Sequence, residues 1–168
     1  MAQVASVDQV LEQVKQKFGF VPNVVTEIAK SPAALQVYVG GSKAMGSATL
    51  SPQEQQAVQL AISTTNKCGY CQAAHSMGGK VAGIAPADLD AIQAGKPPQD
   101  GRLKAVVGAV RLLQEKQGFL SDEDVKSLEG QGVDRVQLYE LIALIGLKTI
   151  TNYVNHIAHT ELDAQLRP

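Results

Sequence analysis

Helix start signals recur along the whole chain, and no stretch of useful length alternates between polar and apolar residues as a strand does. Ser31-Pro32 places an N-cap residue before a proline at the first helical position. Capping boxes begin at Ser51 and at Ser121, where an acidic side chain three residues later reaches back to the cap. Between these signals the apolar residues follow helical spacing, as they do over residues 7–18. The sequence therefore predicts one all-α domain over residues 1–168.

The amino-acid composition fits that prediction and limits the partners. Of the 168 residues, 45% are hydrophobic and 18% are charged, with three Phe, four Tyr and no Trp. Few aromatic residues and many Ala, Leu and Gln favour packed helices over a β-sandwich. The formal net charge is −1 and the charges are interspersed, so we expect neither a nucleic-acid partner nor a basic membrane-binding face.

No segment carries the pattern of export or membrane insertion. Residues 1–6 lack the basic and apolar regions of a secretory signal, and the most apolar run, residues 141–147, is too short to cross a bilayer. We therefore expect a cytoplasmic protein without a membrane partner. In that compartment a C-x-x-C pair is more often catalytic or metal-binding than a structural disulfide.

Caps and apolar spacing set the expected helices. Helices are predicted over residues 7–18 and 23–29, and from start signals at Pro32, Pro52, Pro86, Asp100 and Ser121. A last, long helix from Val133 to His159 is apolar on nearly all sides and is expected to be buried. Within it, Asn152 and Asn155 are expected to form hydrogen bonds to other helices, in the core or at a subunit interface. The pair Gly40-Gly41 is expected to mark a point of close helix packing.

Both cysteines lie in one short stretch, residues 66–75, together with one of the three histidines. A helix turns about 100° per residue, so Cys68, Cys71 and His75 fall at roughly 0°, −60° and −20° around its axis. Asn66 is expected to cap this helix, which would place the cysteines in its first turn. Unpaired N–H groups and the positive end of the helix dipole favour a thiolate there. This arrangement predicts dithiol redox chemistry.

A reactive thiolate also needs a base nearby, and His75 is placed to supply it. If the helices on either side of residues 66–67 are antiparallel, side chains at equal distances from the turn meet. At about 1.5 Å per residue, His75 lies about 13 Å beyond the turn, Gln56 about 15 Å before it and Glu54 about 18 Å before it. Gln56 fits better but cannot accept a proton. Glu54 can accept one, although it lies farther away and also has a capping role.

Several short motifs, most of them between residues 50 and 75, together form a distinctive pattern. It comprises LSPQEQQ at residues 50–56, LAIS at 60–63, NKCGYC at 66–71 and AAH at 73–75, with weaker parts at residues 19–23, 31–32 and 147–156. Together these segments resemble the alkylhydroperoxidase-D branch of the carboxymuconolactone decarboxylase family over most of the chain. The C-x-x-C-x-x-x-H core is the most specific part of the resemblance.

The resemblance implies an orthogonal helical bundle with the C-x-x-C at a helix N-terminus, usually trimeric or hexameric, and activity without haem, flavin or metal. It implies reduction of a hydroperoxide or a disulfide at the expense of a thiol reductant. Cys71 would be the attacking thiol, Cys68 the resolving thiol and His75 part of a proton relay. In the family a Glu twelve residues before the first cysteine completes that relay, and this position is Gln56 here. Glu54 or a water is then the candidate proton acceptor.

Other interpretations stay open. A zinc- or small-ligand-binding module without turnover would use Cys68, Cys71 and His75, with His156 or His159 as a fourth ligand. In a purely structural protein the cysteines would be small buried hydrophobic residues. A lyase acting on a small lactone or acid would keep its activity without either thiol. The decarboxylase members of the family lack the thiol pair, which argues against that last interpretation.

Overall fold

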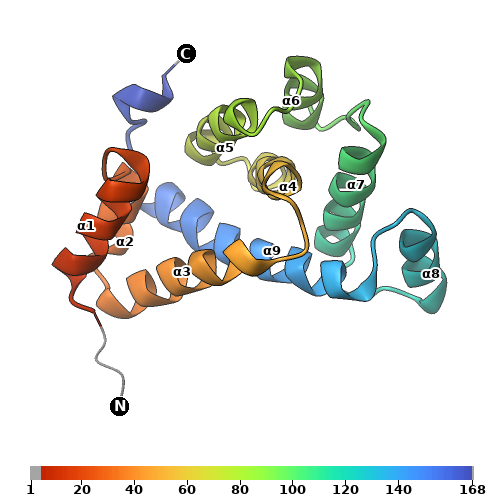
Figure 1. Cartoon of the computed structure of the whole chain (residues 1–168), viewed down its shortest axis with the longest axis horizontal. Coiled ribbons are helices and arrows are strands. Elements are labelled where there is room, and N and C mark those ends of the chain that lie inside the picture. Colours follow the sequence, from red (N-terminus) through yellow and green to blue (C-terminus); the bar gives the residue numbers. More distant parts are fainter. Residues whose placement is uncertain (1–4, 168) are drawn as a thin grey trace.

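The computed structural model describes residues 5–167, which form nine α-helices and two short 3-10 helices (Figure 1). The α-helices are α1 (Val7–Phe18), α2 (Asn23–Ile28), α3 (Pro32–Ala44), α4 (Pro52–Thr65), α5 (Gly69–Val81), α6 (Pro86–Gln93), α7 (Gly101–Glu115), α8 (Asp122–Gly130) and α9 (Arg135–Ala158). The 3-10 helices are η1 (Met45–Ser47) and η2 (Ala164–Leu166). No strand occurs among the described residues, so the all-α prediction is confirmed. The expectation about a secretory signal falls mostly on residues 1–4, which lie outside the described residues.

Helix α4 is the element around which the others pack. Helices α5, α6, α7 and α9 all contact it. Figure 1 shows α4 end-on while α9 runs across the view, so the two helix axes cross at a steep angle. This is the orthogonal bundle that the resemblance implies. The chain reverses directly after α4, and α5 packs back along it, with Gln72 bonded to Ser63 near the turn and Gln53 bonded to Gly83 at the far end.

Local sequence signals set the helix ends. Ser6, Ser51, Ser121 and Asp134 each accept a hydrogen bond from the backbone N–H three residues later, and each completes a capping box. Gly19 ends α1 in the left-handed region with φ 80°, where a side chain would be strained. The predicted helix over residues 7–18 is therefore confirmed at both ends.

The predicted point of close packing in α3 is confirmed at Gly41 only. A methyl group added at Gly41 would lie 2.7 Å from Cδ2 of Leu147 on α9, whereas one added at Gly40 would meet nothing within 4 Å. The bare backbone at Gly41 thus lets α3 lie close against α9.

The long helix α9 is not buried on nearly all sides, so that prediction was wrong for one face. Tyr139, Ile142, Tyr153 and Ile157 are 62%, 48%, 56% and 82% exposed. Their spacings along the sequence keep them on one side of the helix, and we call them the apolar strip of α9. The opposite face packs against α2, α3, α4 and α7. Apolar content alone does not show how many neighbours a helix has, because neighbours are supplied by the tertiary structure.

The apolar interior has two parts. The larger joins α4, α6, α7, α8 and α9, and the smaller joins α1, α2, α3 and the start of α5. Both cysteines belong to the smaller part. None of the described helices has both the length and the apolar content that a bilayer crossing requires.

Candidate active site

The C-x-x-C motif lies at the N-terminus of α5, but Cys68, not Asn66, is the N-cap residue. Asn66 instead ends α4, and its side-chain amide donates a hydrogen bond of 2.8 Å to Oδ1 of Asn152 on α9. The expected cap was therefore wrong by two residues, because Asn66 completes the preceding helix and Lys67, with φ 56°, reverses the chain. Cys71 does lie in the first turn of α5, where free N–H groups favour a thiolate.

The two thiols face a row of buried polar side chains on α9. These side chains share one side of the helix at i, i+3, i+4 and i+7, and they belong to Lys148, Thr151, Asn152 and Asn155. The Nδ2 of Asn155 lies 3.2 Å from Sγ of Cys71 and 3.7 Å from Sγ of Cys68. The Oγ1 of Thr151 lies 3.8 Å from Sγ of Cys71. One amide therefore reaches both sulfurs, which places them together against α9.

Hydrogen bonding and charge give the two thiols different pKa values. A hydrogen bond from the Cys68 thiol and the positive charge of Lys148 lower the pKa of Cys71 to about 5, although burial acts in the opposite direction. The same hydrogen bond, together with burial, raises the pKa of Cys68 above its ordinary value. Both shifts favour ionisation of Cys71 over Cys68, with the Cys68 thiol as the donor.

His75 is held on both ring nitrogens. Its Nδ1 lies 2.9 Å from Oε1 of Gln56 on α4, and its Nε2 lies 2.6 Å from Nζ of Lys148 on α9. Burial and then the charge of Lys148 hold the pKa of His75 well below its usual range, so the ring is neutral at pH 7. The distances estimated along the two helices thus identified the neighbour of His75 on α4 as Gln56.

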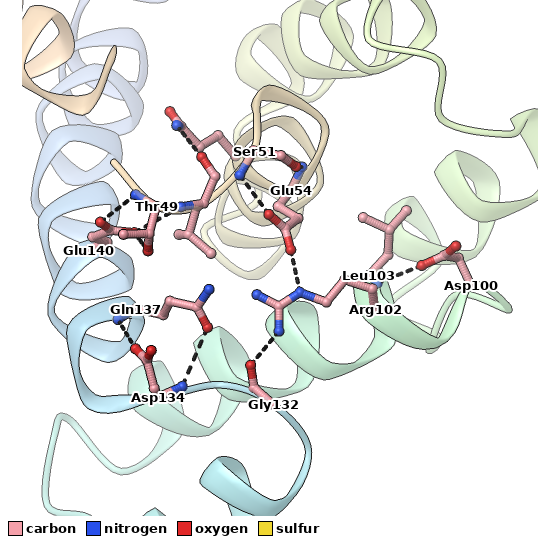
Figure 2. Close-up of polar contacts among 12 residues, drawn as sticks. Thr49, Ser51, Glu54, Asp100, Arg102, Leu103, Gly132, Asp134, Gln137 and Glu140 are labelled. Atoms are coloured by element: carbon pink, nitrogen blue, oxygen red, sulfur yellow. Dashed lines mark hydrogen bonds and ion pairs between the residues drawn. The ribbon is translucent and has the colours of Figure 1, made fainter. Parts of the chain in front are cut away.

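Glu54 lies elsewhere, as Figure 2 shows. One oxygen of its carboxylate accepts a 2.6 Å hydrogen bond from the backbone N–H of Ser51, and the other accepts from Nε of Arg102 on α7. Arg102 also donates a 2.6 Å hydrogen bond to the backbone oxygen of Gly132. Burial acts to raise the pKa of Glu54, but the hydrogen bonds from Ser51 and Arg102 lower it overall. The structure does not bring Glu54 to His75, and the carboxylate instead joins the start of α4 to α7.

We expect Glu54→Gln to lower the free energy of unfolding by about 1–2 kcal/mol, because the variant weakens a helix cap and an ion pair. The Cys71 thiolate should titrate as in the wild-type protein. Denaturant unfolding and the ultraviolet absorbance of the thiolate measure the two quantities. The matched control is Glu123→Gln, which removes the same charge from the exposed first turn of α8. If stability were unchanged but the pKa of the Cys71 thiolate shifted, Glu54 would have to act on the thiol site after all.

Both sulfurs are covered in the single chain, since Cys68 and Cys71 are each 2% exposed. Tyr70, between them, donates a hydrogen bond to Asp163, whose carboxylate also accepts from the backbone N–H of Asn23 at 3.1 Å. This contact ties the C-x-x-C turn to α2 and to the segment after α9. A substrate reaches Cys71 only when part of this cover moves.

The arrangement does not favour a zinc site. Within residues 5–167, no three His, Cys, Asp or Glu side chains are grouped so that they could hold a metal ion. His156 and His159, the expected fourth ligands, are exposed. Both ring nitrogens of His75 are engaged, one by Gln56 and one by Lys148.

Sequence reasoning missed Lys148 and Thr151 as members of this site. It did expect Asn152 and Asn155 to bond across helices, and both do. The missing signal was the helical spacing of four polar residues within a segment otherwise rich in Leu and Ile. A lysine on that row could have been singled out, because an unpaired lysine is almost never fully buried.

The site combines the parts that dithiol chemistry requires. A thiolate that is stabilised by a neighbouring thiol and a cation can attack an electrophilic oxygen, sulfur or carbon atom. The second thiol can then displace the product from sulfur and close a disulfide.

Solved structures show the same fold. An uncharacterized peroxidase-related protein from Silicibacter sp. TM1040 matches with a TM-score of 0.83 and 19% identity over 99% of this chain and 90% of its own. An alkylhydroperoxidase AhpD core, described as an uncharacterized peroxidase-related protein from Ralstonia eutropha JMP134, matches with a TM-score of 0.83 and 19% identity over 98% and 92%. The debrominase Bmp8 in its apo form matches with a TM-score of 0.76 and 18% identity over 96% and 88%. Identities this low establish a shared fold and no more.

Sequence comparison adds the family. No curated protein matches the chain. The sequence profile of the carboxymuconolactone decarboxylase family, however, matches residues 27–112, which span α3 to most of α7 and include the whole C-x-x-C segment. Because this match covers more than half of the 168 residues, the protein belongs to the carboxymuconolactone decarboxylase family.

Proposed function

We propose that this protein is a cysteine-dependent hydroperoxide reductase in which Cys71 attacks the peroxide and Cys68 resolves the product. The observation that carries the proposal is the placement of the two sulfurs together at the start of α5, where the Asn155 amide reaches both. The hydrogen bond from Cys68 and the charge of Lys148 lower the pKa of Cys71, which makes Cys71 the candidate thiolate. A thiolate is the form that reacts with peroxides, and a second thiol nearby prevents overoxidation.

The reaction balances with two thiols and one hydroperoxide. The Cys71 thiolate attacks the terminal oxygen, so an S–O bond forms and the O–O bond breaks. The alkoxide that leaves takes up a proton and becomes the alcohol, while Cys71 becomes a sulfenic acid. The Cys68 thiol then attacks the Cys71 sulfur, and the hydroxyl group leaves as water with the proton of Cys68. An external thiol reductant returns the resulting disulfide to two thiols by supplying two electrons.

Burial of the sulfurs favours a small peroxide over a protein disulfide as the oxidising substrate. Both sulfurs are 2% exposed and lie in an apolar cluster with side chains of α1, α2 and α3. A small hydroperoxide needs only a limited movement of that cover, whereas attack on a disulfide of a folded partner needs the sulfur at the surface. The apolar surroundings also suit an organic hydroperoxide.

Stopped-flow measurement of peroxide consumption by the fully reduced protein tests the proposal. We expect consumption well above that of free cysteine, with loss of both thiols for each peroxide, and its loss in Cys71→Ser. A parallel assay of bromide release from 2,3,4-tribromopyrrole separates the alternative reaction, because a cysteine-to-alanine variant of debrominase Bmp8 is known in complex with that compound. Peroxide consumption no faster than free cysteine would remove the proposal. Activity on a lactone that survives in Cys71→Ser would point to a lyase instead.

We also propose that the protein forms a homo-oligomer through the apolar strip of α9. The strip runs along a helix of 24 residues, and its tyrosine and isoleucine side chains are about half exposed or more. Large exposed apolar side chains gathered on one face of a helix are typical of interaction sites. The family resemblance implies a trimer or a hexamer, so a second copy of this chain is the partner that we expect.

Sedimentation analysis of Ile142→Glu tests this interface. A carboxylate buried within an apolar contact should weaken association by about 2 kcal/mol or more, which is about 30-fold. The matched control is Val81→Glu, since Val81 is 83% exposed on α5 and lies outside the strip. Equal association of both variants and the wild-type protein would exclude the strip as the interface.

A further inference from the structure

A lysine lies buried in the row of α9 side chains that faces the two thiols. Lys148 is 3% exposed. Among the described residues the ion pairs join Lys30 to Glu27, Arg102 to Glu54 and Lys116 to Asp124, and none of them includes Lys148. A buried ammonium without a counter-charge is strongly unfavourable. Lys148 therefore needs an anion of another kind, or it must lose its proton.

The Cys71 thiolate is the candidate anion, because Thr151 and Asn155, on the same face of α9 as Lys148, both reach the Cys71 sulfur. The positive charge of Lys148 lowers the pKa of Cys71, after the hydrogen bond from Cys68 and against burial. Burial lowers the pKa of Lys148 overall, while the negative charge of the Cys71 thiolate acts to raise it. Tyr38 on α3 also faces Cys71, but burial and then the charge of Cys71 raise its pKa to about 12, so it stays neutral.

The contacts of His75 fit a charged lysine. With Oε1 of Gln56 facing the ring, the oxygen accepts from Nδ1, which then carries the ring proton. Nε2 is left with a lone pair that accepts from Nζ of Lys148 at 2.6 Å, and an ammonium there has three donors. A glutamate in place of Gln56 would favour a doubly protonated ring, which would turn a second donor toward the ammonium. The glutamine thus suits a charged lysine.

We propose that Lys148 is the counter-charge that keeps Cys71 ionised, and that Gln56 and His75 are positioning residues that hold the ammonium beside the sulfur. The importance of this arrangement for turnover rests on the proposed function, but the arrangement itself belongs to the reduced protein without substrate. It gives His75 a different part from the relay that the family resemblance implies, because the amide of Gln56 cannot accept a proton from the ring.

Titration of the reduced full-length protein, followed by the ultraviolet absorbance of the thiolate, tests the role of Lys148. We expect Lys148→Met and Lys148→Gln to raise the Cys71 pKa by about one to three units. The matched control is Lys80→Met. It removes a positive charge from the exposed C-terminal turn of α5, the helix that carries Cys71, and should leave the Cys71 titration unchanged. Both Lys148 variants must retain the helical circular dichroism of the wild-type protein, and Lys148→Gln keeps polarity at the site if the methionine variant does not fold.

Gly78→Ala tests the positioning part without changing any titratable group. A methyl group added at Gly78 would lie 2.5 Å from Oε1 of Gln56, so the amide must leave its place on Nδ1 of His75. We expect nitrogen NMR to show His75 with its proton on Nδ1 in the wild-type protein and a mixture of tautomers in Gly78→Ala. An unchanged tautomer in this variant would overturn the role of Gln56.

The two proposals fail separately. A Cys71 pKa that stays near 5 in Lys148→Gln overturns the role of Lys148, whatever the peroxidase activity of the wild-type protein. A wild-type protein that consumes no peroxide but shows the expected pKa shift on loss of Lys148 removes the proposed function and keeps the counter-charge.

Discussion

Replacing Cys68 with serine is expected to leave the first peroxide attack intact and to stop turnover after about one peroxide per chain. We expect Cys71 to remain a thiolate in this variant, because the serine hydroxyl can donate in place of the Cys68 thiol and the charge of Lys148 and the amide of Asn155 remain. No second thiol is present to displace the hydroxyl group, so the Cys71 sulfenic acid accumulates. A burst of peroxide loss followed by a plateau, and labelling of one sulfenic acid per chain by a carbon nucleophile, are the measurements.

Cys71→Ser is the matched control for that experiment. It should show neither the burst nor the label, since the remaining thiol of Cys68 has a raised pKa and stays protonated. Equal bursts in the two single variants would mean that either sulfur can attack. A burst in Cys71→Ser alone would reverse the roles of the two cysteines.

Titration of the reduced wild-type protein should show that Cys71 is already a thiolate at pH 6, which is the second large effect that we expect. With a pKa of about 5, Cys71 is about 90% ionised at pH 6, whereas a thiol with the ordinary pKa of 9.0 is about 0.1% ionised there. The expected thiolate fraction at pH 6 is therefore about a thousand times the ordinary value. The ultraviolet absorbance of the thiolate, taken as the difference between wild type and Cys71→Ser, measures this fraction directly.

The lowered pKa of Cys71 also makes the free energy of unfolding depend on pH, and stability should fall as the pH falls. The pKa of Cys71 is lower in the folded chain than in the unfolded chain, so ionisation of Cys71 stabilises the fold fully above pH 9 and the contribution is lost as the pH falls through 5. The pKa values of His75 and Lys148 are also lowered, so both groups bind protons more readily when unfolded and act in the same direction. Thermal unfolding between pH 9 and pH 5 should show a steady loss of stability, and Cys71→Ser should lose less. A single thiolate midpoint near 9 would contradict both expectations.

The helices of this protein could be predicted from the sequence because their signals are local. A serine or aspartate cap bonds to a backbone group three residues away, and a left-handed glycine ends a helix by its own geometry, so the helix over residues 7–18 and the starts after Ser51 and Ser121 needed no other part of the chain. The error at Asn66 came from the same kind of signal. A good cap residue can also end the helix before it, and which role it takes depends on the contact with Asn152.

The sequence also determined that Cys68, Cys71 and His75 lie near one another, since they are only a few residues apart on one stretch of chain. Helical distances also favoured Gln56 as the neighbour of His75 on α4. Only the tertiary structure decided which face of α9 meets the sulfurs and which charge lies beside His75. Packing gave His75 the neutral amide of Gln56 and the ammonium of Lys148, and it directed the carboxylate of Glu54 toward Arg102. The charge beside a thiol is a property of the space around it, and residues far apart in the chain enter that space only through the fold.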